Sequence, residues 1–232
     1  MKNSRLWIIP AIFFLLASAV NLYGCIIENL TLEHDVKGAL MPLLALTGMT
    51  YLAPRSFNVK TAGTLLLAQL FGWVGDSLLM GSGLVWFASG IGAFLLGHIC
   101  YIRLFCRTLK GLSAAKWMLA FIVMAAIIVA IIVAIGIEGV LLPPMAVYGA
   151  ALLCISFCGL CGICRRKEPC RRVWWMVLLG GVIFLCSDSL IAMRTFGEAN
   201  FALRGFTIMS TYLVAQSLLC AAAVRLAIAD KK

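Results

Sequence analysis

The sequence predicts an all-α fold, a polytopic transmembrane bundle of eight helices with both termini cytoplasmic. Hydrophobic residues make up 63% of the 232 residues, and charged residues make up only 12%. Soluble domains carry roughly twice that share of charge. The mean hydropathy is +1.06, and long apolar runs recur along the chain. Because only helices or closed barrels satisfy their backbone in lipid, we expect one integral membrane domain over residues 1–232.

Eight apolar stretches define the expected spans. They cover residues 6–27, 38–53, 62–80, 84–105, 116–135, 140–162, 173–193 and 204–227. Each is near the ~20 residues that a helix needs to cross the hydrocarbon core, although 38–53 is short. The connections are brief and leave no room for a soluble domain.

The first stretch has features of a signal peptide, namely a basic start, an apolar core and the small residues Ala17, Ser18 and Ala19. The apolar run continues through "VNLYGCII", and an even number of helices needs this span. We therefore expect an uncleaved first helix. The short loops favour a multi-pass protein of the bacterial cytoplasmic membrane.

The basic residues set the expected orientation. With the N-terminus inside, every lysine and arginine except Lys37, Arg194 and Arg204 falls on the cytoplasmic side. This bias matches the excess of positive charge in the cytoplasmic loops of membrane proteins. The net charge of +10 is thus a topology signal that suits anionic lipid, and it does not indicate a nucleic-acid partner.

Cysteine and histidine give weak signals. Only Cys25 of the ten cysteines lies near the outer face, so no disulfide framework is expected. The cysteines at 154, 158, 161 and 164 share one helix face, where packing competes with metal binding as the explanation. The histidines are His34, expected in the acidic outer loop, and His98, inside the fourth span. Two histidines at different depths do not predict a zinc enzyme.

Two acidic residues, Asp76 in "FGWVGDSLLM" and Asp188 in "FLCSDSLIAM", lie within apolar spans. Intramembrane ionisable groups are costly and by default indicate function. Asp76 is about 14 residues into the third span and Asp188 about 15 into the seventh, so each lies roughly 21–23 Å from the cytoplasmic edge. Two carboxylates at one level, on parallel helices, are placed to face each other across a cavity.

The shared Asp-Ser-Leu core suggests an internal repeat. Residues 75–78 align with residues 187–190, four spans further along the chain. A four-plus-four parallel duplication would make the two aspartates equivalent, although the rest of the alignment is poor. Three interpretations stay open for the pair. These are general acid–base catalysis, proton coupling in a transporter, and structural bonding between helices.

The same motifs resemble the YhhN-type family of lysoplasmalogenases. The segments "GWVGDSLLM", "WFASGIGAFLLGHICYI", "GGVIFLCSDSLIAMRTF" and "TYLVAQSLL" carry the resemblance, which extends over the eight spans. A lysine and a proline near the second helix also match, although Lys37 and Pro42 are separated here by "GALM" instead of being adjacent.

The resemblance implies hydrolysis of the vinyl ether bond of lysoplasmalogens to a fatty aldehyde and a glycerophospho-ethanolamine or -choline. It implies that Asp76 and Asp188 are the catalytic pair, and it implies no metal or organic cofactor. The expected partners are the lysophospholipid substrate and membrane lipids. Protonation of the vinyl ether gives an oxocarbenium ion, the kind of cation that two carboxylates handle in glycoside hydrolysis.

Further candidates surround this pair. Tyr212 and Gln216, one helical turn apart, and Asn21 are candidates for substrate binding or for bonds between helices. His98 and Tyr101 match the family's fourth-span motif, but His98 should lie ~21 Å from the outer edge, well below the aspartates. Among the outer cations Lys37, Arg194 and Arg204, one is expected to bind the lipid phosphate unless all are solvated. The candidates for walls of an alkyl-chain pocket, with ordinary packing as the alternative, are Phe71, Trp73, Trp86, Phe87 and Phe94.

Two competing functions remain. Intramembrane aspartyl proteases also use two aspartates, but Ser187-Asp188 and Trp73-Val74-Gly75-Asp76 lack the tyrosine and the first glycine of their signatures. A proton-coupled transporter would be expected to have broken helices beside its site, and no glycine–proline break flanks either aspartate.

Overall fold

The computed structural model describes residues 5–106, 113–136, 142–165, 170–196 and 203–230, and these residues form eight helices and no strands. The helices are α1 (Ile8–Ile26), α2 (Leu30–Leu52), α3 (Val59–Leu79), α4 (Leu84–Phe105), α5 (Ala114–Ile135), α6 (Leu142–Arg165), α7 (Cys170–Phe196) and α8 (Arg204–Ala229). The predicted helical bundle is therefore confirmed.

Seven of these helices, all except α2, are long and apolar enough to cross a membrane, so the chain is an integral multi-pass protein. The exception, α2, begins at Leu30, well before the expected 38–53 span. Its start is fixed by Asn29, whose side chain accepts a bond from the Leu32 backbone N–H at 3.0 Å. The expectation that His34 lies in a loop is thus wrong, because His34 and Lys37 lie within the first turns of α2.

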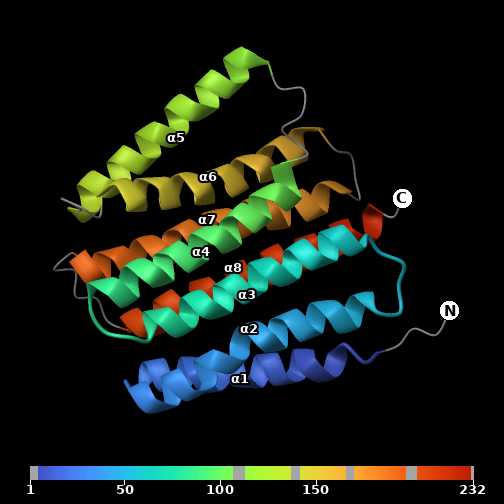
Figure 1. The fold of residues 1–232 in the computed structure, drawn as a ribbon, viewed down its shortest axis with the longest axis vertical. Helices are drawn as coiled ribbons and strands as arrows, with labels where there is room; N and C mark the ends of the chain where they lie inside the picture. The colour runs from blue at the N-terminus through green and yellow to red at the C-terminus, as the bar shows by residue number, and fades with distance from the viewer. Residues whose placement is uncertain (1–4, 107–112, 137–141, 166–169, 197–202, 231–232) are drawn as a thin grey trace.

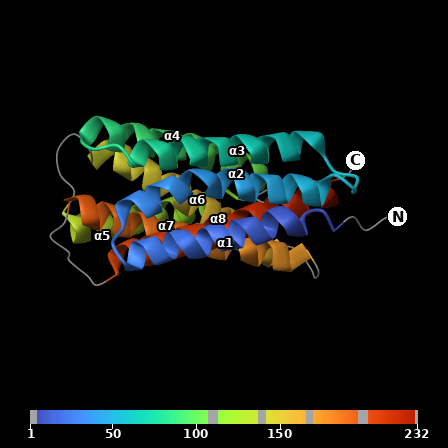
Figure 2. The same ribbon diagram turned by 90° about the horizontal axis from the view of Figure 1, so that it is seen from below.

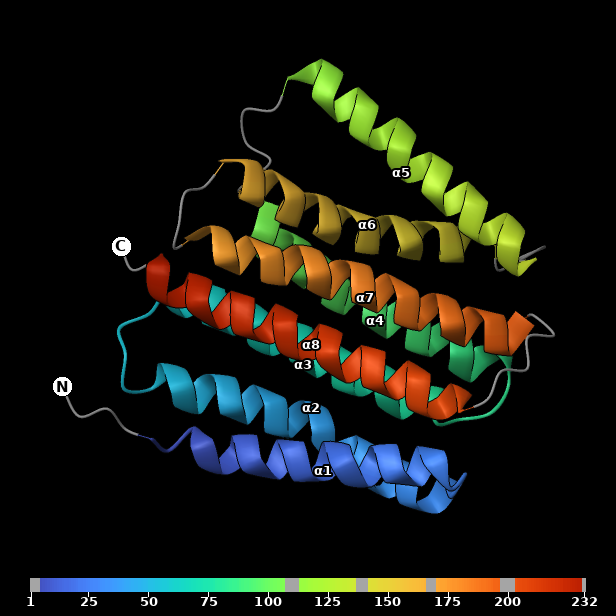
Figure 3. The same ribbon diagram turned by 180° about the vertical axis from the view of Figure 1, so that it is seen from behind.

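The helices run side by side, with α8 in the middle of the bundle (Figures 1 and 3). It contacts α1, α2, α3 and α7, and half of its residues are buried. The pair α3 and α4 lies along one side (Figure 2). At the edge, α5 leans away from the bundle and contacts α6 and α7 (Figure 1). Two spans that carry candidate residues, α3 and α7, are thereby placed on either side of α8.

Helix α1 begins and α8 ends at the same end of the bundle (Figure 1). There the Asn58 backbone N–H, between α2 and α3, donates to the Ala227 carbonyl of α8 at 2.8 Å. Arg55 follows the end of α2, Lys60 lies in the first turn of α3 and Arg103 in the last turn of α4, and these helix ends lie at this end of the bundle. Arg194 lies in the last turn of α7, at the opposite end of the bundle. We call the end with Arg194 the outer end, following the predicted orientation, which itself stays a prediction.

Candidate active site

Asp76 is buried near the outer end of α3, with a side chain that bonds to two other helices. The Tyr212 hydroxyl of α8 donates to its Oδ2 at 2.5 Å. The Lys37 ammonium of α2 lies 3.7 Å from its Oδ1. The preceding Gly75 allows close packing, because a Cβ there would lie 2.7 Å from the Phe94 ring. Asp76 is therefore held by one hydroxyl and one cation inside an apolar bundle.

A proline positions the lysine that meets Asp76. Pro42 lies inside α2 and has no N–H to bond the carbonyl of Gly38, one turn earlier. The Trp73 indole N–H of α3 bonds that carbonyl instead, at 2.8 Å. The bond ties α2 to α3 immediately beside Lys37, so the local break in α2 is satisfied by the helix that carries Asp76.

Asp188 occupies a different environment on α7. The Tyr148 hydroxyl of α6 donates to its Oδ2. Lys37 pairs with Asp76, whereas no lysine or arginine among the described residues forms an ion pair with Asp188. The preceding residue, Ser187, donates to the Ile208 carbonyl at 3.1 Å and fixes this part of α7 against α8. Asp188 thus has a neutral partner where Asp76 has a charged one.

A cluster of aromatic rings joins the two aspartates. The His98 ring lies 5.2 Å from that of Tyr148 and 4.6 Å from that of Phe184, measured between ring centroids. The Phe184 ring lies 5.6 Å from that of Tyr212. Phe94 packs against Phe184 and Tyr212, at 6.3 and 6.0 Å. The chain of contacts runs from Asp188 through these rings to Asp76.

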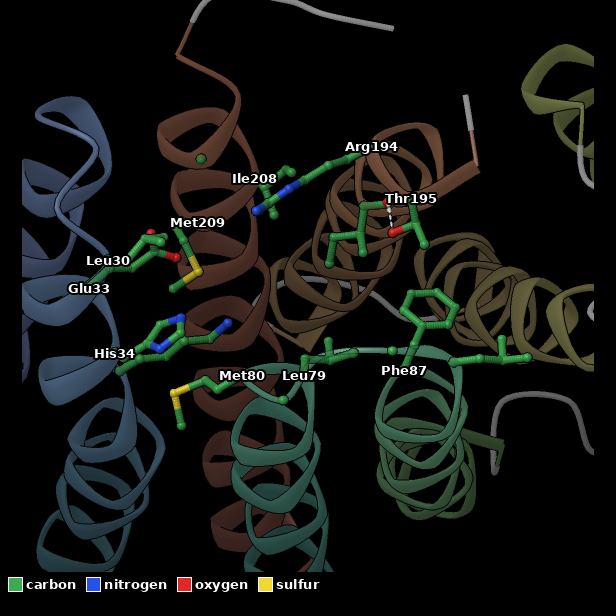
Figure 4. A pocket seen from close by; sticks show the side chains of 16 residues that line it. Leu30, Glu33, His34, Leu79, Met80, Phe87, Arg194, Thr195, Ile208 and Met209 are labelled. Carbon is green, nitrogen blue, oxygen red and sulfur yellow. Dashed lines mark hydrogen bonds between the residues drawn. The ribbon is translucent and has the colours of Figure 1, made fainter. Parts of the chain in front are cut away.

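A cavity of about 470 Å³ opens at the outer end between α2, α3, α4, α7 and α8. Figure 4 shows Glu33 and His34 projecting from α2 on one side, with Arg194 reaching across from α7 on the other. Lys37 also lines the cavity, which connects it to Asp76. The remaining walls are mostly apolar and come from Leu30, Leu79, Met80, Leu84, Phe87, Ile191, Ile208 and Met209. The cavity thus combines charged groups of both signs with mostly apolar walls.

Asp188 lines a smaller cavity of about 40 Å³ between α5, α6 and α7. The other lining groups include Ile128, Ile135 and Met145. The structure therefore differs from the arrangement expected from sequence, in which the two carboxylates face each other across one cavity. Lys37, the partner of Asp76, lines the large cavity, and Asp188 lines the small one. The two cavities are separate because the side chains of the aromatic cluster fill the space between the two aspartates.

Two predicted substrate-binding residues lie in a second polar network. The Tyr101 hydroxyl accepts a bond from the Gln69 amide at 2.7 Å and donates to the Gln216 carbonyl oxygen at 3.2 Å. A Cβ at Gly72 would lie 3.3 Å from the Gln216 amide nitrogen and 4.0 Å from the Tyr212 hydroxyl. The network is therefore adjacent to the Tyr212–Asp76 bond, on the cytoplasmic side of it. The substrate roles of Tyr101 and Gln216 stay predictions.

The other predicted residues are distributed differently. Asn21 of α1 donates to the Glu33 backbone carbonyl at 3.0 Å and so anchors the first turns of α2. Arg194 lines the large cavity. Arg204, at the start of α8, is exposed and is not part of that lining. The substrate roles of Asn21 and Arg194 also stay predictions.

His98 lies below the level of Asp76, in line with its position in α4, and reaches the site through aromatic rings. A Cβ on the preceding Gly97 would lie 3.2 Å from the Ala68 carbonyl of α3, two turns before Asp76. The His98 ring contacts Tyr148, which bonds Asp188. Its buried Nδ1 has no hydrogen-bond partner among the described residues.

Sequence reasoning missed Tyr148, Gln69 and Phe184. The sequence offered one indication for Tyr148, which is a hydroxyl-bearing residue in the apolar span that precedes the span of Asp188. Lys37 likewise lies in the segment that precedes the span of Asp76. Among the described residues, no three His, Cys, Asp or Glu side chains are grouped so that they would hold a metal ion. The cysteine face of α6 includes buried Cys158 and exposed Cys164.

Comparison with known proteins gives a family match. The model of the YhhN family matches residues 32–223, which include both aspartates, all of α3 to α7 and most of α2 and α8. No curated protein matches the sequence. No solved structure matches it either.

Proposed function

The chain belongs to the YhhN family, and from this premise we propose that it is a lysoplasmalogenase that hydrolyses the vinyl ether bond of lysoplasmalogens. The observation that carries the proposal is the pair of buried aspartates, each bonded to a tyrosine hydroxyl and joined by aromatic rings beside a charged cavity. Buried ionisable groups within a membrane domain are costly and are typical of functional sites.

The proposed reaction adds water across the vinyl ether in two stages. A carboxylic acid donates its proton to the double bond at the carbon away from the ether oxygen, which gives an oxocarbenium ion. Water adds to this cation and loses a proton to the other carboxylate. The resulting hemiacetal then breaks its bond to the glycerol oxygen. That oxygen takes the proton held by the second carboxyl group, and the hemiacetal hydroxyl returns a proton to the first, which gives a fatty aldehyde and a free glycerol hydroxyl. Phe94 and Phe184 add aromatic faces, which attract cations.

The neighbouring charges support a division of roles. Lys37 compensates a negative charge on Asp76, so Asp76 is the proposed base and cation stabiliser. Tyr148 gives Asp188 a neutral partner, and an unpaired charge is costly to bury, so Asp188 is the proposed acid. The proposed catalytic pair is therefore asymmetric.

The cavity supports a zwitterionic lysophospholipid as substrate. Arg194 offers positive charge and several hydrogen-bond donors to a phosphate, and His34 offers a ring nitrogen, while Lys37 stays paired with Asp76. Glu33 offers negative charge to the ammonium group of an ethanolamine or choline head group. The head group would thereby lie at the outer end while the ether bond points toward the aspartates.

The test is aldehyde release by the purified protein. Wild type should release aldehyde from lysoplasmalogen and none from the saturated ether analogue. Asp76→Asn and Asp188→Asn should each lower turnover by about 10²–10⁴-fold, since general acid–base catalysis contributes that much. The matched control is Asp35→Asn, an exposed aspartate in α2 that does not line the cavity. Near-normal release from either site variant would falsify the assignment.

The same assay separates the transporter alternative. Asp76 and Asp188 lie within continuous helices, whereas transporter ion sites are typically built from broken ones. If folded wild-type protein releases aldehyde from neither substrate, the hydrolase proposal fails and transport becomes the better account of the aspartates.

A further inference from the structure

An apolar groove lies between α4 and α6, facing outward from the bundle. Its volume is about 280 Å³. The α4 side is formed by Phe87, Ala88, Ile91, Gly92 and Leu95, and the α6 side by Pro143, Pro144, Met145 and Val147. None of these described lining residues has a charged or hydrogen-bonding side chain. An apolar groove of this kind suits a hydrocarbon chain and is unsuited to a head group.

Two residues connect this groove to the candidate active site. Phe87 lines both the groove and the large charged cavity. Its ring lies at the cavity edge, on the first turns of α4 (Figure 4). Met145 lines both the groove and the small cavity of Asp188. The groove therefore adjoins the proposed head-group cavity and the proposed catalytic acid.

The direction of the groove matches that of a lysolipid in a membrane. From Phe87 to Leu95, α4 runs about 12 Å away from the outer end, at 1.5 Å per residue. The charged cavity lies at that outer end. A lipid in the outer leaflet has its head group at the surface and its chain directed toward the bilayer centre. The vinyl ether, at the junction of glycerol and chain, would then lie near Phe87.

We propose that the groove between α4 and α6 binds the hydrocarbon chain of the substrate, which enters and leaves sideways from the bilayer. This inference rests on the proposed function and adds the chain subsite to it. The exposed groove walls, Gly92 and Val147 among them, leave the chain in contact with lipid along one side. The aldehyde product, which keeps the chain, leaves by the same route without crossing the charged cavity.

The structure offers a variant that fills the groove without disturbing the bundle. A Cβ added at Gly92 meets no other atom within 4 Å, so Gly92→Trp adds a large ring at the groove wall without a clash at its base. The matched control is Gly63→Trp, because Gly63 is equally open and lines a separate apolar groove between α2 and α3. Both variants add the same side chain to a lipid-facing groove, and only one of them blocks the proposed subsite.

The experiment compares kcat/KM for an alkenyl chain of sixteen carbons with that for a chain of four. Gly92→Trp should lower kcat/KM for the long chain at least tenfold while changing the value for the short chain less than twofold. Gly63→Trp should change neither. Equal losses on both chains, no loss on the long chain, or the same loss in Gly63→Trp would each overturn the chain subsite.

A second measurement does not depend on turnover. A saturated ether lysolipid that carries a photoreactive diazirine in the middle of its chain is irradiated with the wild-type protein. Labelling of peptides that contain residues 87–95 or 143–147 supports the subsite, and labelling confined to other helices overturns it. If the wild-type protein releases no aldehyde, the proposed hydrolase function fails and the chain subsite can still stand. If peptides with residues 87–95 or 143–147 are not labelled, the chain subsite fails and the hydrolase function can still stand.

Discussion

The surroundings of Asp76 and Asp188 differ in charge, although both aspartates stand in the same Asp-Ser-Leu sequence. Asp76 has Lys37 and Tyr212 as partners, whereas Asp188 has Tyr148. In each case one partner comes from the helix before the aspartate's own, which is α2 for Asp76 and α6 for Asp188. The comparison teaches that the charge around a buried aspartate depends on the helix packed beside it, even where the local sequence motif is the same.

This pairing bears on the predicted duplication. Lys37 precedes Asp76 by nearly the same stretch of sequence as Tyr148 precedes Asp188, so the two partners occupy nearly equivalent places in the two halves. One half has a lysine there and the other a tyrosine. The near-equivalence supports a four-plus-four origin, which stays a prediction. The change from lysine to tyrosine is what the proposed division of roles between the two aspartates would require.

Among changes to the partners of the two aspartates, the largest effect should come from removing the charge that distinguishes the two environments. Lys37→Met leaves an ionised Asp76 without its cation, and we expect kcat/KM to fall about 100-fold, because hydrogen bonds and pairs of charged groups contribute up to about 3 kcal/mol. In the Asp76→Asn background the same change should cost little, since interacting residues are non-additive. Lys60→Met, an exposed lysine near the other end of α3, is the control. Additive losses would show that Lys37 acts independently of Asp76.

The two tyrosines provide the next comparison. Tyr212→Phe removes a donor to the proposed base, and we expect a loss of about 10–100-fold in kcat, since bonds to charged groups contribute about 1.5–3 kcal/mol. Tyr148→Phe removes a donor to the proposed acid, and the expected loss is about 2–10-fold, as for a neutral bond. Turnover measurements on both variants decide the assignment. If Tyr148→Phe has the larger effect, the acid and base roles are exchanged.

The two regions also differ in how far sequence reasoning described them. The apolar runs predicted the helices well because burial in lipid demands continuous apolar segments, and Asp76 and Asp188 were conspicuous for the same reason. The start of α2 was misjudged, because Glu33, His34 and Lys37 read as loop residues by composition. They are helical because Asn29 caps the helix and the charged side chains meet a cavity.

The partners of each aspartate were harder to predict. Tyr212 was found through its spacing from Gln216, but its bond to Asp76 depends on how α8 packs against α3. Tyr148 carried no motif, and its contact with Asp188 follows from the packing of α6 on α7. The cavity between five helices has no sequence signature. Local patterns predict spans and depth, and the contacts between helices require the fold.

A smaller effect should follow from loosening the Lys37 position without changing any charge. Trp73→Phe removes the indole N–H that bonds the Gly38 carbonyl beside the Pro42 break. We expect kcat/KM to fall about threefold to tenfold, roughly the range of a neutral hydrogen bond of about 0.5–1.5 kcal/mol. The effect should disappear in the Lys37→Met background. The control is Trp175→Phe, an exposed tryptophan on α7. An undiminished effect without Lys37 would assign Trp73 a role in packing alone.

The smallest effect on turnover should come from the network below Asp76. Tyr101→Phe removes the hydroxyl that accepts from Gln69 and donates to Gln216, so each of these two buried amides loses a bond. Unmet buried groups cost about 1–3 kcal/mol, so thermal unfolding in detergent should begin at a lower temperature than in the wild type. Turnover should change less than twofold, because the hydroxyl reaches Asp76 only through Gln216 and Tyr212. Tyr23→Phe, an exposed residue of α1, is the control for both measurements. A turnover loss as large as that of Tyr212→Phe would instead extend the active site to Tyr101, as the family motif in α4 predicts.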